Sequence, residues 1–328
     1  MLSEPALHEL KGKKNLLAFS AGVDSSALFF LLLQANIPFD MVIVDYGLRA
    51  QSKEEVAYAK ELAAYHDKIL YHDSVTLLES NFEHQARRHR YNFFEKIIHE
   101  NSFNNLITAH QLNDRLEWFL MQLSKGAGLV EMLGFDEVVQ RNGYRLIRPL
   151  IHTDKEALLF FLDYHDKRYF IDESNSDEKY KRNHIRANFS ETFLKEYKQG
   201  VSKSFHYLQK DKEALFSFEL LYHDKELRVL KRGNSDIRSI DKVLKEMGYL
   251  LSAAQKEEIL RQRESVICDK IVVALVDGLI FIAPFVRETM DKKFKEKCRT
   301  LGIPAKIRPY LKVAEIDPTF LPRIEPTS

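Results

Sequence analysis

The stretch LLAFSAGVDSSALFFLLLQA, residues 16–35, decides the fold. Its first four residues form a short apolar run, which is typical of a buried strand. Residues 26–35 are apolar almost all round, as in a helix packed between a sheet and other elements. Small and polar residues at 20–25 separate the two. A buried strand that turns directly into a buried helix is typical of a parallel α/β sheet.

The same alternation continues along the chain. Further strands are expected at 41–44, 68–71 and 106–109, and helices at 53–65, 83–100 and from about 113. This pattern predicts an α/β fold with a doubly wound parallel sheet, in which ligands bind beyond the carboxyl ends of the strands. Polar clusters at 20–25, 45–49 and 110–117 follow directly after strands. We therefore expect these three clusters to converge on one cleft.

The composition and the pattern of the sequence change after about residue 186. Residues 188–248 look helical and are rich in lysine and glutamate, and 271–283 reads as a hairpin turning at Asp277-Gly278. We predict two domains, 1–195 and 196–328, the second being a smaller, mostly helical α+β part.

Residues 287–315 carry an excess of positive charge. Nine basic and four acidic side chains lie there, an excess that the chain's net charge of +1 conceals. Such a module suits binding to the phosphate backbone of a nucleic acid. The alternative is an exposed helix with incidental lysines.

Composition excludes several classes of protein. The chain has 328 residues, of which 45% are hydrophobic and 30% charged, which argues against global disorder. Cys268 and Cys298 form no CxxC or zinc pattern, as expected of thiols in a reducing compartment. The N-terminal residues lack the apolar core of a signal peptide, and the apolar run 27–33 is too short to cross a bilayer. We expect a cytoplasmic protein with no membrane contact.

The strongest chemical signal is the loop of Ser20, Ala21, Gly22, Val23, Asp24 and Ser25. Small residues let a backbone approach an anion closely, and the amides of the first helical turn then face that anion. Asp24 is unexpected in a phosphate site, but it makes sense if it holds a Mg²⁺ that neutralises pyrophosphate. The alternative is a polar turn in which Asp24 or Ser25 simply caps the helix. The motifs GxxxxGK[ST] and GxGxxG are absent, so neither a γ-phosphate-transfer loop nor a dinucleotide site is supported.

A set of further motifs carries a resemblance to a known family. The loop resembles the SGGxDS loop of the N-type ATP pyrophosphatases of the PP-loop superfamily, with Ala21 in place of the first glycine. The other matching segments are VDYGLR (44–49, family VDHGLR), ARRHRY (86–91, ARxxRY), TAH (108–110, opening TAHHxDDQxET), GAG (126–128), RPL (148–150) and DESNSDEKYKRNHIR (172–186, DPSNxDxxYxRNxIR). Occurring in register and in the family's order over 16–186, they are together similar to tRNA(Ile)-lysidine synthetases.

The resemblance implies a reaction, a fold and partners. The fold would be that of the adenine nucleotide alpha hydrolases. ATP, with Mg²⁺, would adenylate C2 of the wobble cytidine in a tRNA(Ile) with a CAU anticodon and release pyrophosphate. Free L-lysine would then displace AMP, which gives lysidine and changes the codon read from AUG to AUA. The oligomeric state stays open, a homodimer included.

The resemblance also implies roles for particular residues. Asp45 and His110 would complete the ATP site formed by the loop, and Asp24 would be the metal ligand. Catalytic roles fall to Asp24, Asp114 and Arg90. This sequence departs from the family pattern at Gln111 and Asn113, which replace a histidine and an aspartate. The side-chain carbonyl oxygen of Asn113 can still bind a metal ion.

Two predictions in this part of the chain have alternatives in which the residues have no functional role. Asp114 and Glu117 share one face of the predicted helix, which could also be a solvated acidic face. The residues expected to contact RNA phosphates are Arg87, Lys181, Arg182 and Arg186. The alternatives for them are ion pairs with nearby acids or a solvated loop.

Two other functions stay open on the sequence alone. A different PP-loop enzyme that modifies tRNA, such as a thiolase, would be expected to rely on cysteine chemistry. A non-catalytic nucleotide-binding module would need neither Asp24 nor the segment 172–186.

Overall fold

A computed structural model describes residues 1–47, 51–75, 82–171, 181–216, 219–233, 235–276 and 278–322. The chain divides into two compact units, Met1–Gln209 and Lys210–Ser328. This division and the predicted boundary at 195/196 both fall within one long helix, α9 (Glu191–Phe216). Arg49 of the second polar cluster, the motif residues 172–180 and Asp277 of the hairpin turn lie outside the described residues.

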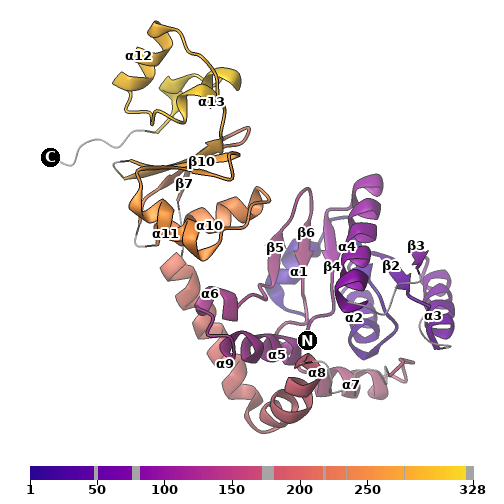
Figure 1. The fold of residues 1–328 in the computed structure, drawn as a ribbon. Helices are drawn as coiled ribbons and strands as arrows, with labels where there is room; N and C mark the ends of the chain where they lie inside the picture. The colour runs from indigo at the N-terminus through magenta and orange to yellow at the C-terminus, as the bar shows by residue number, and fades with distance from the viewer. Residues whose placement is uncertain are drawn as a thin grey trace. The chain divides into compact units, whose positions relative to one another are not determined.

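The first unit alternates strands and helices, as predicted, and can be followed along the chain in Figure 1. Its strands are β1 (Asn15–Ala18), β2 (Asp40–Asp45), β3 (Leu70–Ser74), β4 (Asn105–Ile107), β5 (Val138–Gln140) and β6 (Arg145–Ile147). Its helical elements are α1 (Glu4–Leu10), α2 (Val23–Gln34), α3 (Gln51–Tyr65), α4 (Phe82–Asn101), α5 (Leu112–Leu123), α6 (Leu129–Met132), α7 (Lys155–Tyr164), α8 (Lys181–Ile185), the π-helical turn η2 (Arg186–Ser190) and α9.

The strands of this unit form a doubly wound sheet in the order β3-β2-β1-β4-β6-β5. Every neighbouring pair is parallel except β5 and β6, which places an antiparallel strand at one edge. After β3 the chain returns past β1 to add β4 on its other side. The point where the strand order reverses therefore lies between β1 and β4, where open α/β sheets bind their ligands.

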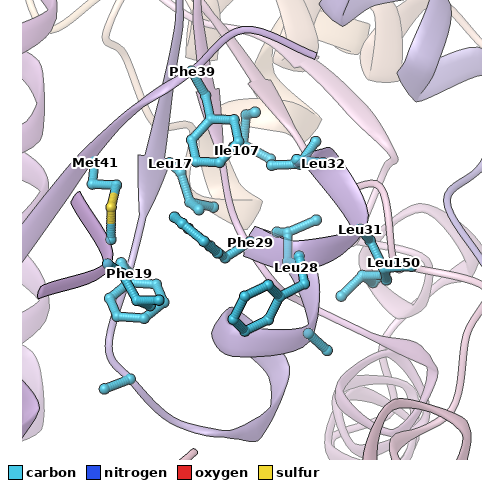
Figure 2. Close-up of a cluster of buried hydrophobic side chains, with 14 of the residues drawn as sticks. Leu17, Phe19, Leu28, Phe29, Leu31, Leu32, Phe39, Met41, Ile107 and Leu150 are labelled. Atoms are coloured by element: carbon cyan, nitrogen blue, oxygen red, sulfur yellow. The ribbon is translucent and has the colours of Figure 1, made fainter. Parts of the chain in front are cut away.

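Both faces of this sheet are covered by apolar packing. Leu17, Met41 and Ile107 belong to a cluster that includes α2 and α7, as Figure 2 shows in part. Phe29 of α2 meets Phe39 edge-on there, with 5.3 Å between the ring centroids. On the other face Leu16, Val42 and Leu106 pack with residues of α4. Helix α2 is buried almost all round, which fixes the position of its N-terminus over the edge of the sheet.

The second unit is an antiparallel sheet with helices on both faces. Its strands are β7 (Leu220–Asp224), β8 (Leu227–Lys231), β9 (Glu264–Ile267), β10 (Ile271–Val276) and β11 (Leu279–Pro284), in the order β7-β8-β11-β10-β9. One face packs on α10 (Asp236–Glu246) and α11 (Ala253–Arg261). The other packs on α12 (Lys292–Thr300) and α13 (Arg308–Val313), with the short 3-10 turn η3 (Pro318–Phe320) following.

The helix expected over 188–248 is interrupted by β7 and β8. The two strands are joined by a turn in which Lys225 has a φ of +51°. Each of these short strands is stabilised by pairing with a neighbour, β8 with β11 for example, which local sequence does not reveal. The hairpin expected at 271–283 is confirmed by β10 and β11. In the described residues, no helix combines the length and apolar character needed to span a bilayer.

Candidate active site

The loop 20–25 joins the end of β1 to the first turn of α2. Ala21 has a φ of +58°, a left-handed backbone conformation that glycine adopts freely and alanine adopts at a cost. Two hydrogen bonds hold this turn: the Ala21 carbonyl oxygen accepts from the Phe170 amide at 2.9 Å and from the Ser26 hydroxyl at 3.2 Å.

Among the described residues, no side chain caps the first amides of α2. Gly22 is the N-cap residue, and its position lacks a side-chain hydrogen bond. The Ser25 hydroxyl instead accepts from the Ser20 amide at 3.2 Å and contacts the Ser20 hydroxyl at 3.1 Å. The loop therefore presents free amide donors at the positive end of a buried helix, which is the geometry of an anion site.

Asp24 lies in the first turn of α2 with one oxygen, Oδ1, fully buried. In the part of the chain that the structure describes, Oδ1 has no hydrogen-bond partner. The pKa of Asp24 is raised to about 7, chiefly by burial and also by the Asp114 carboxylate, although Lys155 and Arg186 act to lower it. A buried carboxylate without a partner is costly unless a cation or a donor joins it. This oxygen therefore fits a metal ion better than a structural role.

A cavity of about 1150 Å³ lies at the carboxyl ends of β1, β2 and β4. The predicted site residues that line it are Ser20, Gly22, Val23, Asp24, Ser25, Asp45, Arg90, His110, Asp114, Arg182 and Arg186. Each of the three polar clusters contributes residues to this cavity, as expected. Ala21 lies behind the wall and is fully buried, and neither Arg87 nor Lys181 lines the cavity.

Asp45 is the last residue of β2, and His110 lies three residues after the end of β4. The Asp45 carboxylate accepts from the Gly47 amide at 2.8 Å, which fixes the turn after the strand. His110 Nδ1 is 2.9 Å from the Thr108 hydroxyl. Burial holds the pKa of His110 well below its usual range, with Arg148 and Arg182 adding to this shift. His110 is therefore neutral at physiological pH and can hydrogen-bond a ligand but not attract it by charge.

The acidic face of α5 is paired with the arginines of α8 and η2. Glu117, whose side chain is 1% exposed, accepts from Arg182 Nε and from Arg186 Nε, each at 2.7 Å. Asp114 is also ion-paired to Arg182 and accepts from the Gln111 amide at 3.0 Å. The charges of the two arginines are thus offset by two carboxylates, and α5 is tied to the end of the segment 172–186. A π-helical turn such as η2 is common at functional sites.

The other predicted RNA contacts lie outside the cavity. Arg87 is exposed on α4, with its guanidinium 4.9 Å from the Tyr91 ring centroid. Lys181 is exposed and donates to the Ser124 hydroxyl at 3.1 Å. Both remain accessible to a phosphate backbone.

Asn113 is not among the described residues that line the cavity. It is buried, and its side-chain oxygen accepts from the Lys155 amide at 3.2 Å, at the start of α7. Lys155 itself lines the cavity and was not anticipated from the sequence. The one local signal was a basic residue at a helix start, where acidic residues are favoured.

Comparison with known proteins identifies the family. Residues 3–192 match the model of a PP-loop domain. The chain is 46% identical to a tRNA(Ile)-lysidine synthase from Wolinella succinogenes over 94% of its own length and 95% of the relative's. It is 44% identical to a tRNA(Ile)-lysidine synthase from Campylobacter jejuni, over 96% and 98% of the two lengths. The chain belongs to the tRNA(Ile)-lysidine synthase family.

A member of this family with a PP-loop domain is an ATP-dependent ligase, and loop 20–25 lies within the matched domain. Among solved structures, the U34-tRNA thiolase NcsA from Methanococcus maripaludis has a TM-score of 0.50 at 14% identity, covering 62% of this chain and 77% of the thiolase. That likeness shows the fold alone. The predicted α/β fold with its second α+β part is confirmed.

Proposed function

We propose that this chain ligates L-lysine to C2 of the wobble cytidine in a tRNA(Ile) with a CAU anticodon. The product, lysidine, changes the codon read from AUG to AUA. The observation that carries this proposal is that loop 20–25, Asp24 and Asp114 line one cavity, in a chain related to lysidine synthases along nearly its whole length.

The proposed reaction has two steps. O2 of the cytidine attacks the α-phosphorus of ATP, which forms a new P–O bond and breaks the bond to the β-phosphate, so that pyrophosphate leaves. The ε-amine of lysine then attacks C2, loses a proton and displaces AMP. Holding the base, the nucleotide and the amine together supplies much of the rate in such a reaction.

Loop 20–25 is the proposed binding site for the phosphates of ATP. The uncapped amides of α2 face the anion, and neutral His110 and Arg90 line the same wall. We assign Arg90 to the triphosphate because it lines the same cavity from α4. Asp45 fixes the turn beside the nucleotide.

Asp24 is the proposed ligand of a Mg²⁺ ion. Its buried, unpartnered Oδ1 and its position beside the phosphate loop fit a cation that also binds phosphate oxygens. When bound, Mg²⁺ would offset the negative charge that develops on the departing pyrophosphate. Asp114 contributes through Arg182, since the ion pair between them places the end of the segment 172–186 against the cavity.

The tRNA is proposed to reach the cavity with its anticodon single-stranded, so that the wobble base can be splayed into the site. Arg87 and Lys181 are free to meet its phosphates. Arg182 and Arg186 would meet them with their charge partly offset by the acids of α5. Because the substrate is a tRNA, we also propose a cytoplasmic location. Association into a homodimer is a separate proposal that the mass of the protein in solution tests.

The proposed function is tested by incubating the protein with ATP, Mg²⁺, labelled lysine and bulk tRNA. We expect label to enter the tRNA with release of AMP. Binding of ATP without formation of AMP would instead support a nucleotide-binding module. The thiolase alternative finds no support in the cysteines, because none is among the described residues that line the cavity, and Cys268 and Cys298 both lie in the second unit.

A further inference from the structure

A second, smaller hollow lies in the first unit, apart from the cavity that loop 20–25 lines. It measures about 340 Å³ and is lined by His152, Ser202, Lys203, His206 and Tyr207. None of these five residues is among those that line the larger cavity. The proposed ligation gives none of them a role, so the function of this hollow is a separate question.

Helix α9 presents four of the five residues on one face. Spacings of three and four positions link them along the helix, which places their side chains next to one another. The other face of α9 is fixed by packing, because the buried Phe205 ring lies 5.6 Å from the Phe119 ring and 4.6 Å from the Arg115 guanidinium. Contact with α5 therefore sets the direction in which the polar face points.

His152 reaches the hollow from the turn that follows β6. This turn is closed by a hydrogen bond of 2.8 Å from the Thr153 amide to the Leu150 carbonyl. The His152 ring also has a neighbour, since its Nε2 is 3.6 Å from a carboxylate oxygen of Glu137. Glu137 itself is not among the described residues that line the hollow.

The lining of the hollow is rich in donors and carries positive charge. It offers two imidazoles, two hydroxyls and one ammonium group, and no acid is among the described residues there. The Lys203 ammonium forms no ion pair with the part of the chain that the structure describes. A metal ion fits poorly, because the ammonium repels it. A phosphate group fits well, because its oxygens accept hydrogen bonds from all of these side chains.

Two features favour a phosphate of an RNA backbone over a free phosphate ion. Tyr207 is 62% exposed, so its ring offers a surface on which a base can stack. Helix α9 also begins at the larger cavity, which its first residue, Glu191, helps to line. The 11 positions from Glu191 to Ser202 span at most about 17 Å of helix, so one RNA arm can reach both places.

We propose that this hollow binds one phosphate group of the tRNA backbone while the wobble base occupies the larger cavity. Lys203 supplies the charge, His152, Ser202 and His206 donate hydrogen bonds, and Tyr207 stacks on a neighbouring base. The inference rests on the proposed function, because it takes a tRNA as the substrate.

The test measures the dissociation constant of a tRNA(Ile) transcript at a series of salt concentrations, without ATP or lysine. Wild type is compared with Lys203→Met, Lys203→Arg, Tyr207→Ala and a control, Lys60→Met. Lys60 is exposed on α3 and lines neither the hollow nor the larger cavity. Calorimetry with ATP shows whether each variant keeps a folded first unit, and calorimetry with inorganic phosphate tests for a free anion.

We expect Lys203→Met to weaken tRNA binding by about 10-fold, as for a charge-assisted hydrogen bond that solvent screens. The slope of log Kd against log salt should fall by about 0.7–0.9, the value for one phosphate contact, and Lys203→Arg should keep it. Tyr207→Ala should weaken binding without changing the slope, because stacking involves no counterion. ATP binding should be unchanged in every variant.

Unchanged tRNA affinity and slope in a folded Lys203→Met would overturn the proposal. So would inorganic phosphate binding that needs Lys203 in a protein whose tRNA affinity does not, because the hollow would then be a site for a free anion. Lysine incorporation is measured separately. A wild type that binds tRNA through Lys203 but incorporates no lysine would contradict the proposed function and leave this inference standing.

Discussion

Replacing Asp24 with asparagine should abolish ligation and at the same time stabilise the ligand-free protein. Burial raises the pKa of this carboxyl from 3.8 to about 7. The folded chain therefore binds the proton more tightly than the unfolded chain does. As the pH rises from about 4 to about 7, ionisation of Asp24 progressively destabilises the fold, and asparagine removes this cost.

The expected gain in stability follows from the size of the pKa shift of Asp24. A rise of about 3 pKa units, at about 1.4 kcal/mol per unit, sets an upper limit of about 4 kcal/mol at pH 8. Local relaxation and entry of water reduce this, and we expect about 2 kcal/mol or more. The carboxylate's favourable interaction with the dipole of α2 opposes the gain, but it is worth only about 0.3–1 kcal/mol.

The assay is urea unfolding followed by the fluorescence of Trp118. It is the only tryptophan of the chain and lies in the first unit, so it reports on the unit that holds Asp24. The stability gained by Asp24→Asn should be larger at about pH 8 than at about pH 5. Glu61→Gln, which removes a charge from the exposed face of α3, controls for net charge.

A variant that is no more stable than the wild type at pH 8 would refute the assignment of a buried, unpartnered carboxylate. Retention of ATP cleavage by a folded Asp24→Asn would refute its role as metal ligand. The two outcomes are independent of each other, because the first is measured without nucleotide.

Three further changes test other parts of the structure. Glu117→Gln should lower the free energy of unfolding by about 1–3 kcal/mol, because Arg182 and Arg186 both lose a charged partner whose side chain is only 1% exposed. The loss stays in this range because both arginines remain partly exposed to solvent. An unchanged Trp118 unfolding curve would contradict this. Ala21→Val should lower the free energy of unfolding by about 2 kcal/mol or more and weaken ATP binding, because a β-branched residue is strained at a φ of +58° and this position is fully buried. Ala21→Gly is the matched control and should bind ATP normally. A Cys268→Ser, Cys298→Ala double variant should keep most of its lysine incorporation, and loss of activity in a folded double variant would revive the thiolase alternative.

The fold of the first unit was largely predictable, because its information is local. An apolar run, a turn of small residues and a second apolar run specify β1, the loop and α2 in sequence order. The positions of Asp24 and His110 then follow from topology, since the carboxyl ends of parallel strands share one edge. The shared face of Asp114 and Glu117 followed from helical spacing.

The features that were missed depend on contacts between distant segments. The ion pairs of Glu117 join residues 65 and 69 positions apart along the chain, which no local pattern encodes. Strands β7 and β8 form where helix was expected, since each is stabilised by a partner strand. Lys155 escaped notice because its position depends on a hydrogen bond from its amide to a side chain on another helix.

The most direct test of the central claim uses a tRNA(Ile) transcript with a CAU anticodon. The transcript is incubated with ATP, Mg²⁺ and lysine, digested to nucleosides and analysed by mass spectrometry, with Asp24→Asn as the inactive control. We predict that lysidine replaces the wobble cytidine and that one AMP and one pyrophosphate appear for each lysidine formed. An unmodified cytidine in the presence of wild-type protein that binds ATP would contradict the account.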